Sequence, residues 1–279
     1  MVGAPEQKLI IEYAQEKHKI SERRACRLFD APRSAIRYRP VENDDEIVKE
    51  KILKIAEKRP RFGSPRIHQM LLRSGLVINH KRTERLYSEL DLSLRKKNKK
   101  KRYKNAVRVL PAAPTEKNEI WSMDFIHDAL SYGRKIKGLT IVDLFTKESP
   151  AIELNYSLSG FGVIAVLERL KGEGQLPSTI KVDNGPEFIC LALDKWASDN
   201  GVKLFFSRPG KPTDNANIES FNGKFRDEFL NLHWFASLEQ AKILCEEWRI
   251  DYNEERPHSS LNYMTPKEFI NSLEIMIAS

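Results

Sequence analysis

The sequence predicts an α/β domain built on a mixed five-stranded sheet and preceded by all-α, helix-turn-helix-like segments. Near residue 115 the pattern changes from apolar residues at helical spacing to short apolar strands. Beyond that point three strands form a meander, followed by alternating helices and strands, which is the order of an α/β domain. With 279 residues the chain is long enough for about two domains with real cores.

The charge divides the chain at the same place. Residues 1–118 carry 30 Lys and Arg against 15 Asp and Glu, whereas residues 119–279 carry 17 against 24. A basic part joined to an acidic part indicates that one end binds a polyanion, and nucleic acid explains this better than a solvated basic surface. Three widely spaced cysteines form no zinc or disulfide pattern, and neither a signal peptide nor a membrane helix is visible. We therefore expect a cytoplasmic protein with no membrane partner.

The first predicted segment, residues 1–40, contains three short helices. Apolar residues recur at helical spacing between Glu6 and His18, Ser21 is placed to cap the second helix, and the third ends near Tyr38. Short helices with a basic last member are typical of a helix-turn-helix, and a generic helical cap is the alternative.

The second predicted segment, residues 44–94, is a helical DNA-binding domain. It opens with an amphipathic helix from Asp44 to Arg59, and Asn79 is placed to cap its last helix. The apolar face of the first helix is expected to comprise Ile47, Ile52, Ile55 and Ala56. The phosphate contacts expected from this domain are Arg66, Lys81, Arg82 and Arg85.

Residues 95–115 are predicted to be a basic linker. Eight of the ten residues from Arg95 to Lys104 are Lys or Arg, so self-repulsion extends the run until a phosphate backbone lies beside it. The DNA contacts expected here are Lys96, Lys97, Lys99, Lys100, Lys101 and Arg102.

The remaining residues, 116–279, are predicted to form the α/β domain. Its expected strands are residues 120–126, 138–145, 151–154, 179–182 and 202–207. Its expected helices are residues 161–170 and 188–199, one that begins near Asn215, and 238–252. The tail after Tyr252 is expected to pack irregularly, and within it His258 suits a structural role better than a DNA contact.

Three acidic residues of this domain are candidates for a metal site. Asp124 lies on the first predicted strand, Asp183 directly follows the fourth, and Glu219 lies on the helix after Asn215. If the two strands are neighbours, both aspartates reach one edge of the sheet. Carboxylate oxygens bind hard cations such as Mg²⁺, and paired ions of that kind catalyse phosphodiester chemistry.

Each of these acids also has a structural alternative. Asp124 could form a buried salt bridge, Asp183 could serve the turn at Asn184-Gly185, and Glu219 could lie on a solvated helix face. Asp143 and Glu187 are the closest rival acids.

Basic residues follow Glu219 along its helix. Arg226 stands seven positions later, two turns along the same face, with Lys224 close to it, which suits a metal ligand beside a DNA strand. The turn-rich loop before the helix, residues 208–217, is typical of a substrate-handling loop, and Lys211 within it is a further expected DNA contact.

Several motifs together resemble a known family. Asp124, Asp183 and Glu219, with 35 residues between the last two, look like the D,D(35)E triad of retroviral integrases and bacterial transposases. The flanking segments are similar to the second-frame product of the IS-three insertion-sequence family, in an order that covers nearly the whole chain. These segments are residues 62–68, 79–82, 121–125, 182–188, 208–212, 218–223 and 252–266.

The resemblance implies an RNase H-like catalytic domain that cleaves DNA strands and transfers them at insertion-sequence ends, with water or a DNA 3′-OH as nucleophile. It also implies two Mg²⁺ ions per active site, replaceable by Mn²⁺, held by the triad. The implied partners are the double-stranded DNA of terminal inverted repeats and targets, and a second copy or the first-frame or fusion protein, at the bacterial nucleoid. Because no leucine-zipper heptads precede residue 44, we expect the second-frame product alone. An idle DNA-binding regulator, accessory to the fused enzyme, and a free RNase H-like nuclease are the rival functions.

Overall fold

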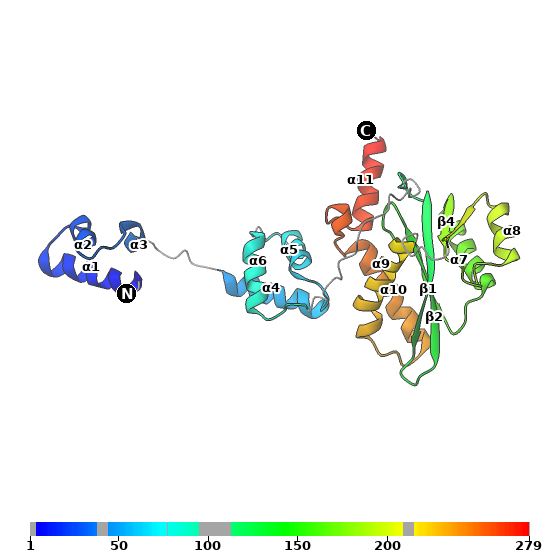
Figure 1. Cartoon of the computed structure of the whole chain (residues 1–279), viewed down its shortest axis with the longest axis horizontal. Helices are drawn as coiled ribbons and strands as arrows, with labels where there is room; N and C mark the ends of the chain where they lie inside the picture. Colours follow the sequence, from blue (N-terminus) through cyan, green and yellow to red (C-terminus); the bar gives the residue numbers. More distant parts are fainter. Residues whose placement is uncertain (1–3, 38–43, 77, 95–112, 209–214, 279) are drawn as a thin grey trace. The chain divides into compact units, whose positions relative to one another are not determined.

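The computed structural model describes residues 4–37, 44–76, 78–94, 113–208 and 215–278 (Figure 1). The chain divides into two units, Met1–Glu50 and Lys51–Ser279. Most of the predicted basic linker lies outside the described residues, so its six expected DNA contacts have no structural account. The domain boundaries drawn from the sequence stay predictions.

The smaller unit contains α1 (Ala4–His18), α2 (Glu22–Leu28) and α3 (Arg33–Arg37). The predicted cap is confirmed, because the Ser21 side chain accepts a hydrogen bond from the backbone N–H of Arg24. Two arginines of α3, Arg33 and Arg37, donate hydrogen bonds to Glu22 at 2.9 and 2.8 Å. A small apolar core formed by Ile11, Ala14, Ala25, Cys26, Ala31 and Ile36 holds the three helices together.

Three more helices follow, α4 (Asp45–Lys58), α5 (Ser64–Arg73) and α6 (His80–Glu89). The predicted apolar face of α4 is wrong in part, because Ile47 is 57% exposed while Val48 and Ile52 are buried. Val48 and Ile52 are four residues apart, so they lie on the same face of the helix. Ile47 is one residue before Val48 and therefore lies on a different face. Asn79 caps α6 as predicted, since its side chain accepts a hydrogen bond from the N–H of Lys81 at 3.0 Å.

The larger unit is built around a five-stranded sheet with the order β3-β2-β1-β4-β5. The strands β1 (Ile120–Ala129), β2 (Lys135–Asp143) and β3 (Ile152–Asn155) form the predicted antiparallel meander. The strands β4 (Thr179–Val182) and β5 (Lys203–Phe206) run parallel to β1. The mixed sheet and its RNase H-like strand order confirm the predicted fold class.

Helices cover both faces of this sheet (Figure 1). The helices α7 (Gly160–Gly172) and α8 (Leu191–Asp199) lie on one face, and α9 (Ala216–Glu228) and α10 (Leu238–Glu254) on the other. Ile141 and Val142 belong to opposite cores because successive side chains of a strand alternate between its faces. The helix predicted from Phe188 begins only at Leu191, because the buried Phe188 ring instead stacks on Phe125, with centroids 4.9 Å apart.

The tail is more regular than predicted. It contains a 3-10 turn (Ser259–Leu261) and a further helix, α11 (Pro266–Ala278). Thr265 and Glu268 form a capping box, in which each side chain accepts a hydrogen bond from the backbone N–H of the other. This spacing, with Pro266 at the first helical position, was the overlooked sequence signal. His258 is buried against Tyr252, which supports its structural role.

A buried amide joins α10 to the turn after β2. The Asn253 Oδ1 atom accepts a hydrogen bond from the N–H of Ser149, and its Nδ2 donates to the Ser149 carbonyl, both at 2.9 Å. Asn253→Leu would leave the buried Ser149 N–H unpaired, whereas the Ser149 carbonyl would keep its hydrogen bond from Arg249 at 2.9 Å. We therefore expect a loss of about 2 kcal/mol in the free energy of unfolding. Urea denaturation measures this loss, and Asn231→Leu, at an exposed asparagine, is the control. Equal stability of the two variants would contradict the role given to Asn253.

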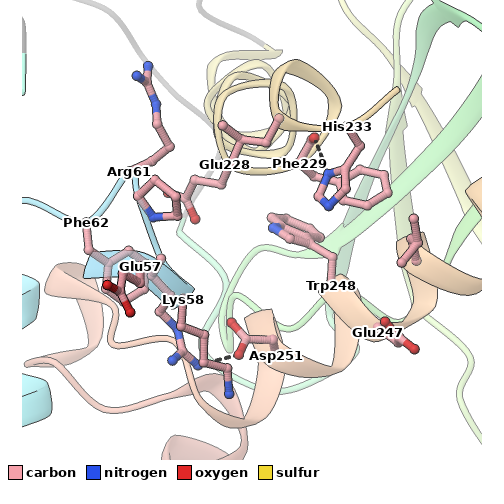
Figure 2. A pocket seen from close by; sticks show the side chains of 14 residues that line it. Glu57, Lys58, Arg61, Phe62, Glu228, Phe229, His233, Glu247, Trp248 and Asp251 are labelled. Atoms are coloured by element: carbon pink, nitrogen blue, oxygen red, sulfur yellow. Dashed lines mark hydrogen bonds and ion pairs between the residues drawn. The ribbon is translucent and has the colours of Figure 1, made fainter. Parts of the chain in front are cut away.

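A hollow of about 590 Å³ lies along the seam between residues 57–62 and helices α9 and α10 (Figure 2). Phe62, Phe229 and Trp248 contribute apolar surface to it, and an ion pair joins Arg59 to Asp251 in its wall. None of the three candidate acids lines this hollow. No helix in the described part of the chain is both long and apolar enough to cross a membrane.

Candidate active site

Asp124 and Asp183 lie at the same end of two neighbouring strands. β1 and β4 pair in parallel, and their register continues to Ser122 beside Lys181. Asp124 and Asp183 each lie two residues beyond that pair. The strand adjacency that the sequence argument required is therefore present.

Helix α9 brings a third acid and an amide to this edge. Glu219 is exposed in the first turn of α9. Asn222, three residues later on the same side of the helix, donates from Nδ2 to Oδ2 of Asp124 at 2.9 Å. Its Oδ1 atom accepts a hydrogen bond from the Thr140 hydroxyl at 2.7 Å, so Asn222 connects α9 to both β1 and β2. Asn222 is a residue to which the sequence assigned no role, although its spacing from Glu219 was an available signal.

The charges of Asp183 and Glu219 act on the carboxyl group of Asp124. Burial, with a smaller contribution from the negative charges of Asp183 and Glu219, raises the pKa of Asp124 to about 6. Hydrogen bonds from the Phe125 N–H and from Asn222 oppose the rise without cancelling it. A carboxyl group in this position is stabilised in its ionised form by a nearby cation.

The acids do not form a closed ligand cluster. Over the described ranges, no three or more His, Cys, Asp and Glu side chains lie close enough together to hold a metal ion. Asp183 instead accepts a hydrogen bond at Oδ1 from the N–H of Gly185 at 2.9 Å. The donor set still fits a hard divalent cation, because it consists of carboxylate oxygens that repel one another and share one edge of the sheet.

The two rival acids are engaged by protein donors. Asp143 accepts hydrogen bonds from the backbone N–H groups of Asn118, Phe145 and Thr146. Glu187 forms an ion pair with Lys137, whose hydrogen bond lowers the pKa of the Glu187 carboxyl group. Both side chains therefore have structural partners that explain their presence.

The residues expected to contact DNA differ in exposure and in their hydrogen-bond partners. Arg226 is exposed and donates from Nη2 to the His127 carbonyl at 3.0 Å, while Lys224 is half-buried. Lys81 and Arg85 are exposed on α6, where Arg85 also pairs with Glu89, and Arg82 is half-buried there. Lys211 lies outside the described residues. All of these DNA contacts stay predictions.

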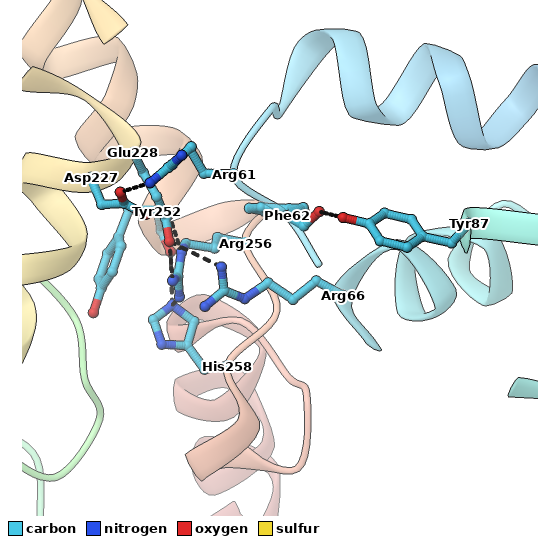
Figure 3. Close-up of polar contacts among 9 residues, drawn as sticks. All are labelled: Arg61, Phe62, Arg66, Tyr87, Asp227, Glu228, Tyr252, Arg256 and His258. Atoms are coloured by element: carbon cyan, nitrogen blue, oxygen red, sulfur yellow. Dashed lines mark hydrogen bonds and ion pairs between the residues drawn. The ribbon is translucent and has the colours of Figure 1, made fainter. Parts of the chain in front are cut away.

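Arg66 takes part in a buried ionic cluster at the end of α9 (Figure 3). Glu228 accepts two hydrogen bonds from Arg256, both at 2.7 Å, and one from Arg66 at 3.0 Å. Burial alone would raise the pKa of Glu228, but the hydrogen bonds and charges of the two arginines outweigh it and lower this pKa. The cluster ties the start of α5 to α9 and to the chain after α10.

Models of known protein families match most of this chain. Two models described as integrase core domains match residues 114–212 and 200–266, and an HTH-like domain model matches residues 42–101. The 31.7 kDa protein of insertion element IS407 from Burkholderia multivorans is 47% identical, over 91% of this chain and 92% of that protein. The chain belongs to the IS-three family of insertion-sequence transposases.

Two further insertion-element proteins agree with this assignment. The 39.2 kDa protein of insertion element IS476 from Xanthomonas euvesicatoria is 42% identical, over 91% of this chain and 73% of that protein. The transposase for insertion sequence element IS904 from Lactococcus lactis is 25% identical, over 80% and 93%. The magnesium-bound catalytic core of HTLV-2 integrase aligns with a TM-score of 0.45 and 17% identity, over 58% of this chain and 97% of that core.

Proposed function

We propose that this transposase-family chain cleaves DNA strands and transfers them at insertion-sequence ends, with Asp124, Asp183 and Glu219 as its catalytic carboxylates. The observation that carries the proposal is the meeting of β1, β4 and α9 at one sheet edge, where burial and, to a smaller extent, the charges of Asp183 and Glu219 raise the pKa of Asp124. Two Mg²⁺ ions, replaceable by Mn²⁺, bound to these carboxylates would polarise the scissile phosphate and activate the attacking oxygen of water or a DNA 3′-OH.

The side chains around the acids prepare the site for this chemistry. Asn222 donates a hydrogen bond to one oxygen of Asp124, which restricts the orientation of that carboxylate. Arg226, exposed two turns along α9 from Glu219, is placed to hold a phosphate beside that edge. The substrates are double-stranded insertion-sequence ends and target DNA. The chain acts in the bacterial cytoplasm, with a second copy or the first-frame partner.

The direct test is an assay of end cleavage and joining. Purified protein is incubated with duplex DNA that carries the terminal repeats of its own insertion sequence, with Mg²⁺, with Mn²⁺ or with EDTA. We expect nicks or joined ends only with a metal. Tight binding to the ends without cleavage under either metal would refute the catalytic proposal and favour a regulatory DNA-binding protein.

Asn222→Ala should lower strand cleavage by about 10- to 100-fold, the usual effect of removing a group that orients a metal ligand. The acids themselves remain, so raising the Mn²⁺ concentration should recover part of the rate. Cleavage rates measured against metal concentration test this, with Asn217→Ala, at an exposed position earlier on α9, as the control. An unchanged metal dependence in Asn222→Ala would show that Asn222 does not act through Asp124.

A further inference from the structure

A second hollow, of about 500 Å³, lies beside α9, and we call it the α9 hollow. It is formed jointly by α9 and by the residues around the start of α5, which belong to the HTH-like region. Its lining residues are Arg61, Arg66, Ser220, Gly223, Lys224, Asp227 and Glu228. Ser220 follows Glu219 directly but lies about 100° further round α9, so the hollow opens on the face of the helix next to the one that carries Glu219.

The charges around this hollow do not balance. Arg61 pairs with Asp227, and Arg66 and Arg256 both pair with Glu228. Lys224 is half-buried and has no ion-pair partner among the residues that the structure describes. Burial, together with the positive charges of Arg256 and Arg66, lowers the pKa of Lys224 to about 8, and Glu228 opposes this shift. A bound anion would stabilise the charged form of an ammonium group that lies among other cations.

Gly223 is a second, independent sign of a ligand. It lies inside α9, where glycine destabilises a helix relative to alanine. A Cβ atom added at Gly223 would meet no atom within 4 Å, so no neighbouring group in the described structure requires a glycine there. Gly223 is one turn after Glu219 and next to Lys224. The missing side chain leaves an open surface between the acid and the unpaired lysine.

We propose that the α9 hollow binds a backbone phosphate of the DNA whose scissile bond lies at Glu219. Lys224 supplies the charge, the Ser220 hydroxyl and the Arg61 guanidinium donate hydrogen bonds, and Gly223 lets the backbone approach the helix closely. Arg61 is 42% exposed at its side chain, so it can turn from Asp227 to the phosphate. This phosphate would join the HTH-like region and the catalytic helix through one strand of DNA. The inference rests on the proposed function for the identity of the ligand.

DNA binding by the Lys224→Met variant tests the phosphate site independently of DNA cleavage. Binding of a short duplex of arbitrary sequence is measured by fluorescence anisotropy in EDTA over a series of salt concentrations. We expect the slope of log affinity against log salt to fall by about 1, the loss of one phosphate contact. Lys195→Met, at an exposed lysine of α8 on the opposite face of the sheet, should keep the wild-type slope. Equal slopes in both variants would overturn the proposal.

Two further variants distinguish a shared phosphate from general loss of charge or of fold. Because Arg61 and Lys224 bind the same phosphate, the combined Arg61→Met, Lys224→Met variant should weaken binding less than the product of the single effects. Independent effects would overturn the shared site. Gly223→Leu should weaken duplex binding while the melting temperature does not fall, and unchanged binding would argue against close approach at α9. Binding without cleavage would refute the catalytic proposal and leave this phosphate site intact.

Discussion

Asp183→Asn should abolish strand cleavage and transfer while duplex binding persists. The substitution keeps the shape of the side chain and removes one carboxylate charge from the edge shared with Asp124. Electrostatic stabilisation by a bound metal contributes several kcal/mol to phosphodiester chemistry, and each 1.36 kcal/mol is a factor of ten, so we expect a loss of about 10³-fold or more. Single-turnover cleavage of terminal-repeat DNA measures the rate, and anisotropy measures the binding.

The matched control for this prediction is Asp199→Asn, at an exposed aspartate that ends α8. It changes the net charge by the same amount and should leave cleavage at the wild-type rate. Glu187→Gln tests the rival acid directly. If Glu187→Gln is inactive and Asp183→Asn is active, the assignment of Asp183 is wrong.

Glu228→Ala should destabilise the larger unit by about 3–5 kcal/mol, because it leaves buried arginine charges uncompensated. Arg256 is 2% exposed and Glu228 10% exposed at their side chains, so water cannot replace the lost carboxylate. Glu228→Gln should lose nearly as much, since it keeps the volume and removes only the charge. Urea denaturation measures both losses, with Glu254→Ala, at an exposed glutamate near the end of α10, as the control.

The same cluster gives the stability a defined dependence on pH. The arginines hold the pKa of Glu228 below 4.5, the value for an unperturbed glutamate, so the unfolded chain binds the proton more readily than the folded one. The stabilisation is therefore present above pH 4.5 and is lost as the pH falls through the lower pKa of the folded state. Glu228→Ala should lack this part of the acid dependence. An identical decline in the variant and the wild type would mean that Glu228 is not the responsible group.

Local patterns were enough to predict the elements that position the site. The strand Thr179–Val182 is found with its predicted ends, and Ser21 and Asn79 cap their helices as expected. These features depend on neighbouring residues only, because apolar alternation and capping act over a few positions. The capping box at Thr265 and Glu268 is of the same kind, and could have been predicted.

Other features depend on residues that are far apart in the chain. Asn222 bonds to Asp124 across 98 positions, and Arg66 bonds to Glu228 across 162. No periodicity links such residues, since their contact follows from how α9 packs on the sheet and on the start of α5. A basic side chain such as Arg66 therefore has the same sequence signature whether it faces phosphate or a buried carboxylate.

The sequence by itself determined the α/β class, the division between a basic and an acidic part, and the three acids with their family resemblance. Only the tertiary structure decided that β1 and β4 are parallel neighbours, which places Asp124 beside Asp183. It also decided that Lys224 is left without a partner among the described residues while Arg61, Arg66 and Arg256 are paired. The physical reason is that residue type and spacing are local properties of the chain. Burial and charge balance are set by every segment that packs around a residue.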